Sequence, residues 1–371
     1  MNALEHFQAV AGLPLSRWLE HFPDRRPLGL YNAYVPEELF YAAGLTPVYV
    51  FHRPEDRGHA LSHLPNFTCW PARSLIDQAA AGELHGLAGM AFPQTCDTVK
   101  ALAEMWRRAE PSVPAYYVGV PAHLAAPVAR PYLIAELERL RQTLGGVSDA
   151  ALQQAFSIYN HTRGLMARLY ERAADLGPTD LYATLRAAFV MPKEEYNALL
   201  KGLLGDLTPS FFHGPRLIVV GPHLADPAIY HMIEEAGGRV VDDLLDIGRR
   251  YFEPPVTVQG DLVSALADRI LATLPTPSKH HPARRRDNHL IAQVTARQAD
   301  GVIFARQKFC DPHGFDYANA RLALSRAGIP SLLVELEQTP QLGQMRTRVQ
   351  AFCETIGHGN RPATAATEES L

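Results

Sequence analysis

Apolar residues follow two patterns in the first third of the chain, which are short continuous runs and a helical spacing. Short apolar runs rich in β-branched and aromatic residues predict strands at 28–35, 46–51, 87–95 and 115–121. The segments between them, at 37–44, 71–82 and 97–109, show helical spacing, with Asp97 as the expected N-cap of the last. Strands and helices that alternate in this way predict a parallel sheet with helices on both faces.

The pattern changes in the middle of the chain. Between residues 130 and 176, leucines and aromatic residues recur every three or four positions, with an interruption at Gly145-Gly146. This spacing predicts a pair of amphipathic helices. Helical spacing continues from 181 to 204, where Pro192 is expected to open the last segment. We therefore interpret residues 130–210 as a helical connector.

The alternation of strand and helix then returns. Strands are expected at 216–222, 239–245, 301–307 and 331–337, and helices at 227–237, 261–274, 286–299, 315–328 and 343–356. The predicted fold is α/β, with two parallel-sheet lobes of the Rossmann or flavodoxin type, at 1–129 and 211–357, joined by the connector. Residues 358–371 are polar and are expected to form a flexible tail.

The length, charge and apolar content of the chain exclude several classes of protein. A chain of 371 residues exceeds the roughly 150 residues of one domain, which agrees with two lobes. A net charge of -4 gives no reason to expect nucleic acid as a partner. No apolar run approaches the roughly 20 residues that cross a membrane, and the N-terminus lacks the pattern of a signal peptide. We therefore expect a cytoplasmic protein with no membrane partner.

Three of the four cysteines share one sequence context. Cys69, Cys96 and Cys310 each lie just past an apolar, strand-like run and just before a helix-like one. Loops and helix N-termini converge at this edge of an open α/β sheet, where ligands are held. Since Cys310 belongs to the second lobe, a joint site would lie between the lobes.

Four cysteines are too few for a disulfide framework in a chain of this length. In a reducing compartment they are core residues, nucleophiles or metal ligands. No CxxC spacing is present, and a single cysteine is more often a small buried apolar residue. Cys353, inside an amphipathic helical run, is interpreted as structural. Three gathered thiolates predict an iron–sulfur cluster with one iron open to water, hydroxide or a substrate oxygen.

Longer segments resemble a known family. Residues 307–317 (Gln-Lys-Phe-Cys-Asp-Pro-His-Gly-Phe-Asp-Tyr), 327–337 and 343–348 are similar to the C-terminal signature of the 2-hydroxyacyl-CoA dehydratase/benzoyl-CoA reductase family. The segment 34–39 (Tyr-Val-Pro-Glu-Glu-Leu) resembles the family's opening motif, and Thr95-Cys96-Asp97 with Lys100 resembles its middle cysteine motif. These segments occur in the family's order over most of the chain.

The resemblance implies a subunit that pairs with a homologous second subunit, as a homodimer or heterodimer. It also implies a [4Fe-4S] cluster on Cys69, Cys96 and Cys310, and electrons from a separate ATP-dependent iron–sulfur activator protein. The substrate would be an acyl-CoA, which is dehydrated, or reduced in the aromatic ring by benzoyl-CoA reductases. Many members carry a small hydroxyl or thiol residue near Asn32 or Ala33, and this chain does not. Whether this subunit holds substrate or relays electrons therefore stays open.

Four further residues are candidates for function. Glu37 is a candidate proton shuttle, although a first-turn glutamate is also favoured by the helix dipole. Lys308 would steer an anionic thioester or a partner, or is ordinary surface charge. Arg284 and Arg285, in a basic run, would bind coenzyme A phosphates, or lie on a solvated loop. No GxGxxG or P-loop motif occurs, so the chain itself is expected to bind no nucleotide.

Two other classes of protein remain as alternatives. In the first alternative, the chain is an iron–sulfur electron-relay subunit with no substrate of its own. In the second, it is a cluster-free binding protein with two α/β lobes and a cleft. The second alternative is disfavoured, because a signal peptide is missing and three cysteines occupy strand ends.

Overall fold

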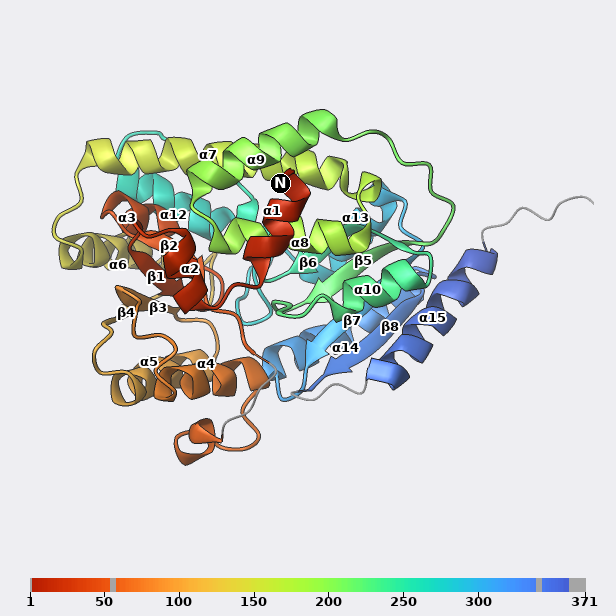
Figure 1. Ribbon diagram of the computed structural model, residues 1–371, viewed down its shortest axis with the longest axis horizontal. Coiled ribbons are helices and arrows are strands. Elements are labelled where there is room, and N and C mark those ends of the chain that lie inside the picture. Colours follow the sequence, from red (N-terminus) through yellow and green to blue (C-terminus); the bar gives the residue numbers. More distant parts are fainter. Residues whose placement is uncertain (1, 54–57, 338–341, 360–371) are drawn as a thin grey trace, which may run out of the picture.

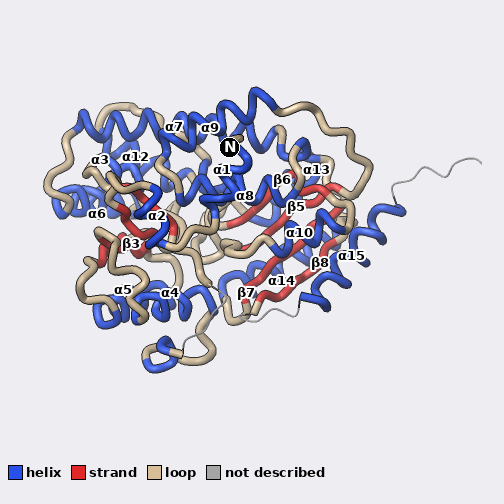
Figure 2. Tube along the Cα trace, in the orientation of Figure 1, coloured by secondary structure: helices blue, strands red, loops and turns tan. Residues whose placement is uncertain are grey.

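The structure is a computed structural model that describes residues 2–53, 58–337 and 342–359. It contains two parallel sheets of four strands each, which lie side by side in Figures 1 and 2. The first sheet has the order β2-β1-β3-β4, with β1 at Pro27–Leu30, β2 at Thr46–Tyr49, β3 at Gly89–Pro93 and β4 at Ala115–Val118. The second has the order β6-β5-β7-β8, with β5 at Arg216–Gly221, β6 at Arg239–Leu245, β7 at Gly301–Gln307 and β8 at Ser331–Leu336.

The two sheets share one topology. In each, the first strand along the chain pairs with the second on one side and with the third on the other. The loops that leave the first and third strands therefore diverge to opposite faces, which makes a topological switch point at the carboxyl ends of β1 and β3, and of β5 and β7. This arrangement confirms the predicted fold class of two parallel-sheet lobes.

Helices cover both sheets and join them. The first lobe carries α1 (Ala3–Ala11), α2 (Leu15–His21), α3 (Glu37–Ala42), α4 (Trp70–Ala80) and α5 (Asp97–Ala109). The connector consists of α6 (Ala129–Thr143), α7 (Asp149–Glu171), α8 (Pro178–Val190) and α9 (Lys193–Asp206). The second lobe carries α10 (Ala228–Glu235), α11 (Arg249–Phe252), α12 (Leu262–Ala272), α13 (Arg286–Arg297), α14 (Asp311–Arg326) and α15 (Leu342–Gly359). Helices α7, α8 and α9 lie along one side of both sheets (Figure 1).

One apolar cluster runs through the whole molecule. It includes Leu28 of β1, Leu169 of α7 and Val219 of β5, all fully buried. Helix α1 packs against α8, and the indole of Trp18 in α2 donates a hydrogen bond to the Val190 carbonyl at 2.6 Å. The connector is therefore packed into both lobes, and the contacts between lobes are fixed by buried side chains.

Several predicted boundaries differ from the structure. Strand β1 ends at Leu30, because Asn32 and Tyr34 adopt left-handed backbone conformations with φ near 73° and 74°. Asp97 is the first helical residue of α5, and Cys96 occupies the N-cap position instead. Helix α14 begins at Asp311, four residues earlier than expected.

Other elements were not expected from the pattern at all. These are α1, α2, α11 and two 3₁₀ turns at His59–Ser62 and Ala173–Asp175. Helix α15 continues to Gly359, and the remainder of the expected tail lies outside the described residues. Among the helices of the described ranges, none combines the length and the apolar character that a membrane crossing requires.

Candidate functional site

The loops at the two switch points meet at one cavity. Its lining includes Tyr31 and Asn32 after β1, Thr95 and Cys96 after β3, Pro222 and His223 after β5, and Cys310 after β7. The cavity volume is about 50 Å³, which is below the roughly 300–1,000 Å³ of sites for drug-sized molecules.

All three candidate cysteines line this cavity, and each is the N-cap of a helix. Cys69 precedes α4, Cys96 precedes α5 and Cys310 precedes α14. None of the three thiols forms a capping hydrogen bond to its own helix. Three helix N-termini with their partial positive charge thus point at the same cavity, which favours an anionic occupant.

The route to Cys69 differs from the expectation. This cysteine does not directly follow a strand, because β2 ends at Tyr49 and the 3₁₀ turn His59–Ser62 intervenes. The segment after β2 nevertheless returns to the sheet edge before α4 begins, so Cys69 reaches the cavity with the other two.

The cavity wall contains buried polar atoms that have no hydrogen-bond partner. They are Thr95 Oγ1, His223 Nε2, Asp246 Oδ1 and Gln307 Oε1. An unpartnered buried polar atom carries a desolvation cost of about 1–3 kcal/mol. Four such atoms around one cavity indicate that a bound group or ordered water completes the site.

His223 presents an unpartnered ring nitrogen, Nε2, on this wall. The Asn32 N–H donates to the Tyr49 hydroxyl oxygen at 2.8 Å, and that hydroxyl lies 3.3 Å from His223 Nδ1. Burial lowers the pKa of His223 to about 4, so the ring is neutral at neutral pH. A neutral imidazole has one N–H donor and one acceptor nitrogen, so Nε2 offers the cavity whichever of the two roles Nδ1 does not take toward Tyr49.

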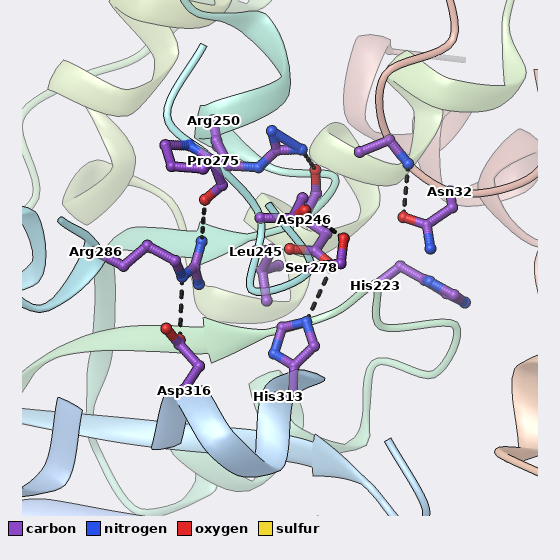
Figure 3. A network of polar contacts seen from close by, with 12 residues as sticks. Asn32, His223, Leu245, Asp246, Arg250, Pro275, Ser278, Arg286, His313 and Asp316 are labelled. Carbon is purple, nitrogen blue, oxygen red and sulfur yellow. Dashed lines mark hydrogen bonds and ion pairs between the residues drawn. The ribbon is translucent and has the colours of Figure 1, made fainter. Parts of the chain in front are cut away.

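A buried polar network joins His313 to Asp246 and Arg250 (Figure 3). His313, in the first turn of α14, places Nε2 3.0 Å from Asp246 Oδ2, and Arg250 donates to the Asp246 backbone carbonyl at 2.8 Å. Burial would raise the pKa of Asp246, but His313, Arg250 and Arg286 outweigh it and hold the pKa at about 2. The network therefore holds the start of α14, and with it Cys310, through buried polar contacts.

The donor set fits a cluster better than a single ion. Within the described ranges, no three His, Cys, Asp or Glu side chains lie close enough to share one metal ion. In a [4Fe-4S] cluster each cysteine binds a different iron, so the thiolates surround the group and do not converge on one point. The three cysteines line one cavity from separate segments, so the donor set fits such a cluster, and its presence stays a prediction.

Cys69 and Cys310 would have to lose a proton before they bind metal. Burial raises the pKa of Cys69 to about 11, and burial together with the neighbouring Cys69 raises the pKa of Cys310 well above its usual range. Without metal both are therefore thiols at neutral pH, and metal binding would release their protons.

Glu37 does not line the cavity. It is buried at the start of α3, where its carboxylate accepts a hydrogen bond from the Tyr251 hydroxyl and lies 3.4 Å from Lys193 Nζ. Burial raises the pKa of Glu37, and the Lys193 charge opposes the rise. The carboxylate thus joins the first lobe to α9 and α11, and its role in proton transfer stays a prediction.

The basic candidates also lie apart from the cysteines. Arg284 and Arg285 line a second cavity between α11, α12 and α13. There Arg284 donates to the Leu271 carbonyl at 2.5 Å, and Arg285 forms a two-pronged ion pair with Asp287. Lys308 pairs with Glu337 at 2.9 Å and lines neither cavity. The arginines therefore remain candidates for a separate site.

Cys353 lies in α15, is 2% exposed and packs in the large apolar cluster. Its position agrees with a structural role.

The site residues that were not predicted from the sequence are Tyr31, His223, Asp246 and His313. Tyr31, His223 and Asp246 lie within two residues of the carboxyl end of a strand. His313 lies three residues after Cys310. Closeness to a strand end or to a candidate cysteine is the one sequence signal that identifies these four residues.

Comparison with known proteins finds similarity to subunits of enzymes that act on CoA thioesters. The model of a family described as 2-hydroxyglutaryl-CoA dehydratase, D-component, matches residues 32–356, which include all three cysteines. The beta subunit of (R)-phenyllactyl-CoA dehydratase from Clostridium sporogenes is 28% identical over 94% of this chain and 97% of its own length. A subunit of benzoyl-CoA reductase from Thauera aromatica is 27% identical, over 92% and 93%. The beta subunit of (R)-2-hydroxyglutaryl-CoA dehydratase from Acidaminococcus fermentans is 25% identical, over 95% and 98%.

Proposed function

The chain belongs to the 2-hydroxyglutaryl-CoA dehydratase D-component family, and from this membership we propose that it is the iron–sulfur subunit of an enzyme acting on a CoA thioester. Its relatives are subunits of 2-hydroxyacyl-CoA dehydratases and of a benzoyl-CoA reductase. The proposed reaction is therefore dehydration of a 2-hydroxyacyl-CoA, with reduction of an aromatic acyl-CoA as the alternative.

One observation supports the proposal most strongly. Cys69, Cys96 and Cys310, from three separate segments and both lobes, line one cavity. Cys353 lies inside the large apolar cluster and lines no part of this cavity, whereas Cys69 and Cys96 pack against the apolar cluster of the first lobe and also line the cavity with Cys310. We propose that these three thiolates hold a [4Fe-4S] cluster.

Bound there, such a cluster would supply single electrons of low potential and would leave one iron without a protein thiolate. The chain's own residues perform the remaining tasks. The three cysteines would hold the group, the helix N-termini stabilise its negative charge, and the Asp246–His313 pair holds Cys310 in position.

The proposed partners follow from the family. Relatives are named as subunits, which supports a second subunit beside this one. We further propose an ATP-dependent iron–sulfur activator as the electron donor, since this chain has no P-loop of its own. Arg284 and Arg285 are proposed to contact the phosphates of coenzyme A at the second cavity.

The second candidate function is electron relay without a substrate, and the acid–base groups favour it. Glu37 lies outside the cavity, and Asp246, which lines it, has a pKa of about 2 and stays ionised. Neither group is matched to proton transfer at neutral pH from this cavity. A relay subunit needs no such group.

Metal analysis of protein purified without oxygen tests the cluster. We expect about four irons and four sulfides per chain in the wild type, and loss of iron in Cys69→Ser, Cys96→Ser and Cys310→Ser. Cys353→Ala is the matched control, because Cys353 is buried outside the cavity. This variant should keep its iron. Iron-free wild-type protein under strict exclusion of oxygen would refute the proposal.

Activity assays separate the reactions. With the partner subunit and the activator present, turnover of a 2-hydroxyacyl-CoA but not of benzoyl-CoA would support a dehydratase, and the converse a reductase. If this subunit only relays electrons, CoA thioesters will bind the partner subunit alone in equilibrium dialysis.

A further inference from the structure

A tyrosine lies beside all three cysteines. Tyr31 directly follows β1, the strand between β2 and β3 in the first sheet. Its N–H donates to the Ala91 carbonyl at 3.2 Å, which extends the pairing of β1 with β3 by one residue. The side chain therefore leaves the sheet at the switch point, where the cavity begins.

Tyr31 is held rigidly and is close to all three thiols. It is 3% exposed and lines the cavity with Cys69, Cys96 and Cys310. Its ring packs against Phe92 and His223, with centroid distances of 6.4 and 6.3 Å. Burial raises the pKa of Tyr31 well above its usual range, and the neighbouring Cys69, Tyr49, Cys96 and Cys310 raise it further.

The hydroxyl has no partner in the protein. Across the part of the chain that the structure describes, the Tyr31 side chain forms no hydrogen bond or ion pair. Unpartnered hydroxyls enclosed by protein occur at Tyr159 and Tyr230, but the Tyr31 oxygen is not enclosed in that way. It therefore opens on the cavity that its ring lines.

We propose that the Tyr31 hydroxyl donates a hydrogen bond to the group held by Cys69, Cys96 and Cys310. This inference rests on the proposed function, since the acceptor is a sulfur of the cluster. A phenol is protonated at neutral pH and is a good donor, and sulfide and thiolate sulfurs are its acceptors. A hydrogen bond to a cluster sulfur stabilises the reduced state, because the added electron increases the negative charge on sulfur. Tyr31 is therefore a positioning and tuning residue, and the sulfur ligation itself belongs to the cysteines.

The test is the reduction potential of the cluster in Tyr31→Phe, measured by a redox titration followed by electron paramagnetic resonance. We expect iron and sulfide contents equal to the wild type and a potential shifted to more negative values. Tyr230→Phe is the matched control, because Tyr230 is equally buried, carries an unpartnered hydroxyl and does not line the cavity. Its potential should equal that of the wild type.

A second readout detects the hydrogen bond itself. Resonance Raman bands of the Fe–S bonds should shift on exchange into D₂O in the wild type, and the shift should decrease in Tyr31→Phe. Replacement of Tyr31 by 3-fluorotyrosine keeps the hydroxyl and makes it a stronger donor, so its potential should move to less negative values. This variant tests the proposal even if Tyr31→Phe loses the cluster.

The two proposals fail in different ways. Wild-type protein without iron and sulfide would overturn the proposed function. A wild type that holds its cluster, with no change of potential in Tyr31→Phe or in the fluorotyrosine variant, would overturn the role of Tyr31 alone.

Discussion

The buried pair of Glu37 and Lys193 allows a test of whether Glu37 is structural or chemical. Glu37 is 2% exposed and Lys193 is 4% exposed, and their charged atoms lie 3.4 Å apart. The substitution Glu37→Gln keeps the size of the side chain and an oxygen that accepts the Tyr251 hydroxyl. It removes only the negative charge, and leaves the Lys193 ammonium buried with the Ala188 carbonyl and the face of the Tyr159 ring as partners.

The expected cost follows from this geometry. Two unit charges 3.4 Å apart attract by about 5 kcal/mol at an effective dielectric constant of about 20. Removing one member of a buried pair typically costs about 3–5 kcal/mol, since the other charge stays in the interior without compensation. A domain has a total stability of about 5–15 kcal/mol. Glu37→Gln should therefore lose a large part of the free energy of unfolding.

Urea unfolding of the protein, followed by tryptophan fluorescence, measures this loss. Lys193→Met and the double variant Glu37→Gln/Lys193→Met complete a cycle, and the double variant should recover most of the stability because no unpaired charge remains. Glu20→Gln is the control, since its pair with Arg17 is exposed and should change stability by less than about 1 kcal/mol.

If the role of Glu37 is structural, stability and activity should change together in these variants. A Glu37→Gln protein with an unchanged urea midpoint and lost activity would contradict it, and would support the role in proton transfer. Lower stability that the second substitution restores, with activity restored in parallel, would place Glu37 in the scaffold.

Three further predictions follow from other groups. Burial raises the pKa of Asp243 from 3.8 to about 6. The contribution of this carboxyl group to stability is therefore present below pH 3.8, and about 3 kcal/mol of the free energy of unfolding is lost as the pH rises through 6. Urea unfolding at pH 4 and 7.5 should show this loss in the wild type and not in Asp243→Asn. A Cβ at Gly248 would lie 2.2 Å from Asp243 Oδ1, so Gly248→Ala should lower the stability by about 1–3 kcal/mol, and an unchanged midpoint would show that the carboxylate moves freely. Arg284→Ala and Arg285→Ala should each weaken coenzyme A binding about tenfold in calorimetry if they contact its phosphates, and equal affinities would remove them from the site.

Regular elements with a clear apolar pattern were predictable from sequence. The bounds of β6, β7 and α5 agree with the expected ranges, because each is a buried run or amphipathic segment bordered by polar residues or glycine. The capping box of Asn2 and Glu5 was a usable signal for α1, although the apolar periodicity alone does not reveal it.

Positions governed by backbone conformation were not predictable. The apolar run from 28 to 35 gives no sign that β1 stops at Leu30, because the turn depends on left-handed conformations of Asn32 and Tyr34, and neither is glycine. The expected start of α14 at residue 315 was too late, because the helix begins at Asp311 and Pro312 is tolerated in its first turn.

The candidate site was predictable in part, for the same reasons. Cys96 and Cys310 follow strands of different sheets, and the rule that ligands bind at carboxyl ends brings them to one place. Glu37 obeys a similar pattern but lies elsewhere, because the turn after β1 carries α3 away from the sheet edge toward Lys193 and Tyr251. Sequence position near a strand end is therefore not sufficient by itself, because the short segment after β1 leads Glu37 away while the longer segment after β2 brings Cys69 to the cavity.

The position of the cavity gives the connector a role in the site although it contributes no residue to the lining. Cys96 and Cys310 lie on different sheets, so the distance between their sulfurs depends on how the lobes are held relative to each other. Helix α7 sets this relation through the buried pair of Arg163 with Glu38 of α3, and through Tyr170, which donates to Asp243 of β6 at 2.6 Å. A rigid cluster tolerates little change in the separation of its ligands. Substitutions in α7 should therefore impair cluster binding even though they are remote from the cysteines.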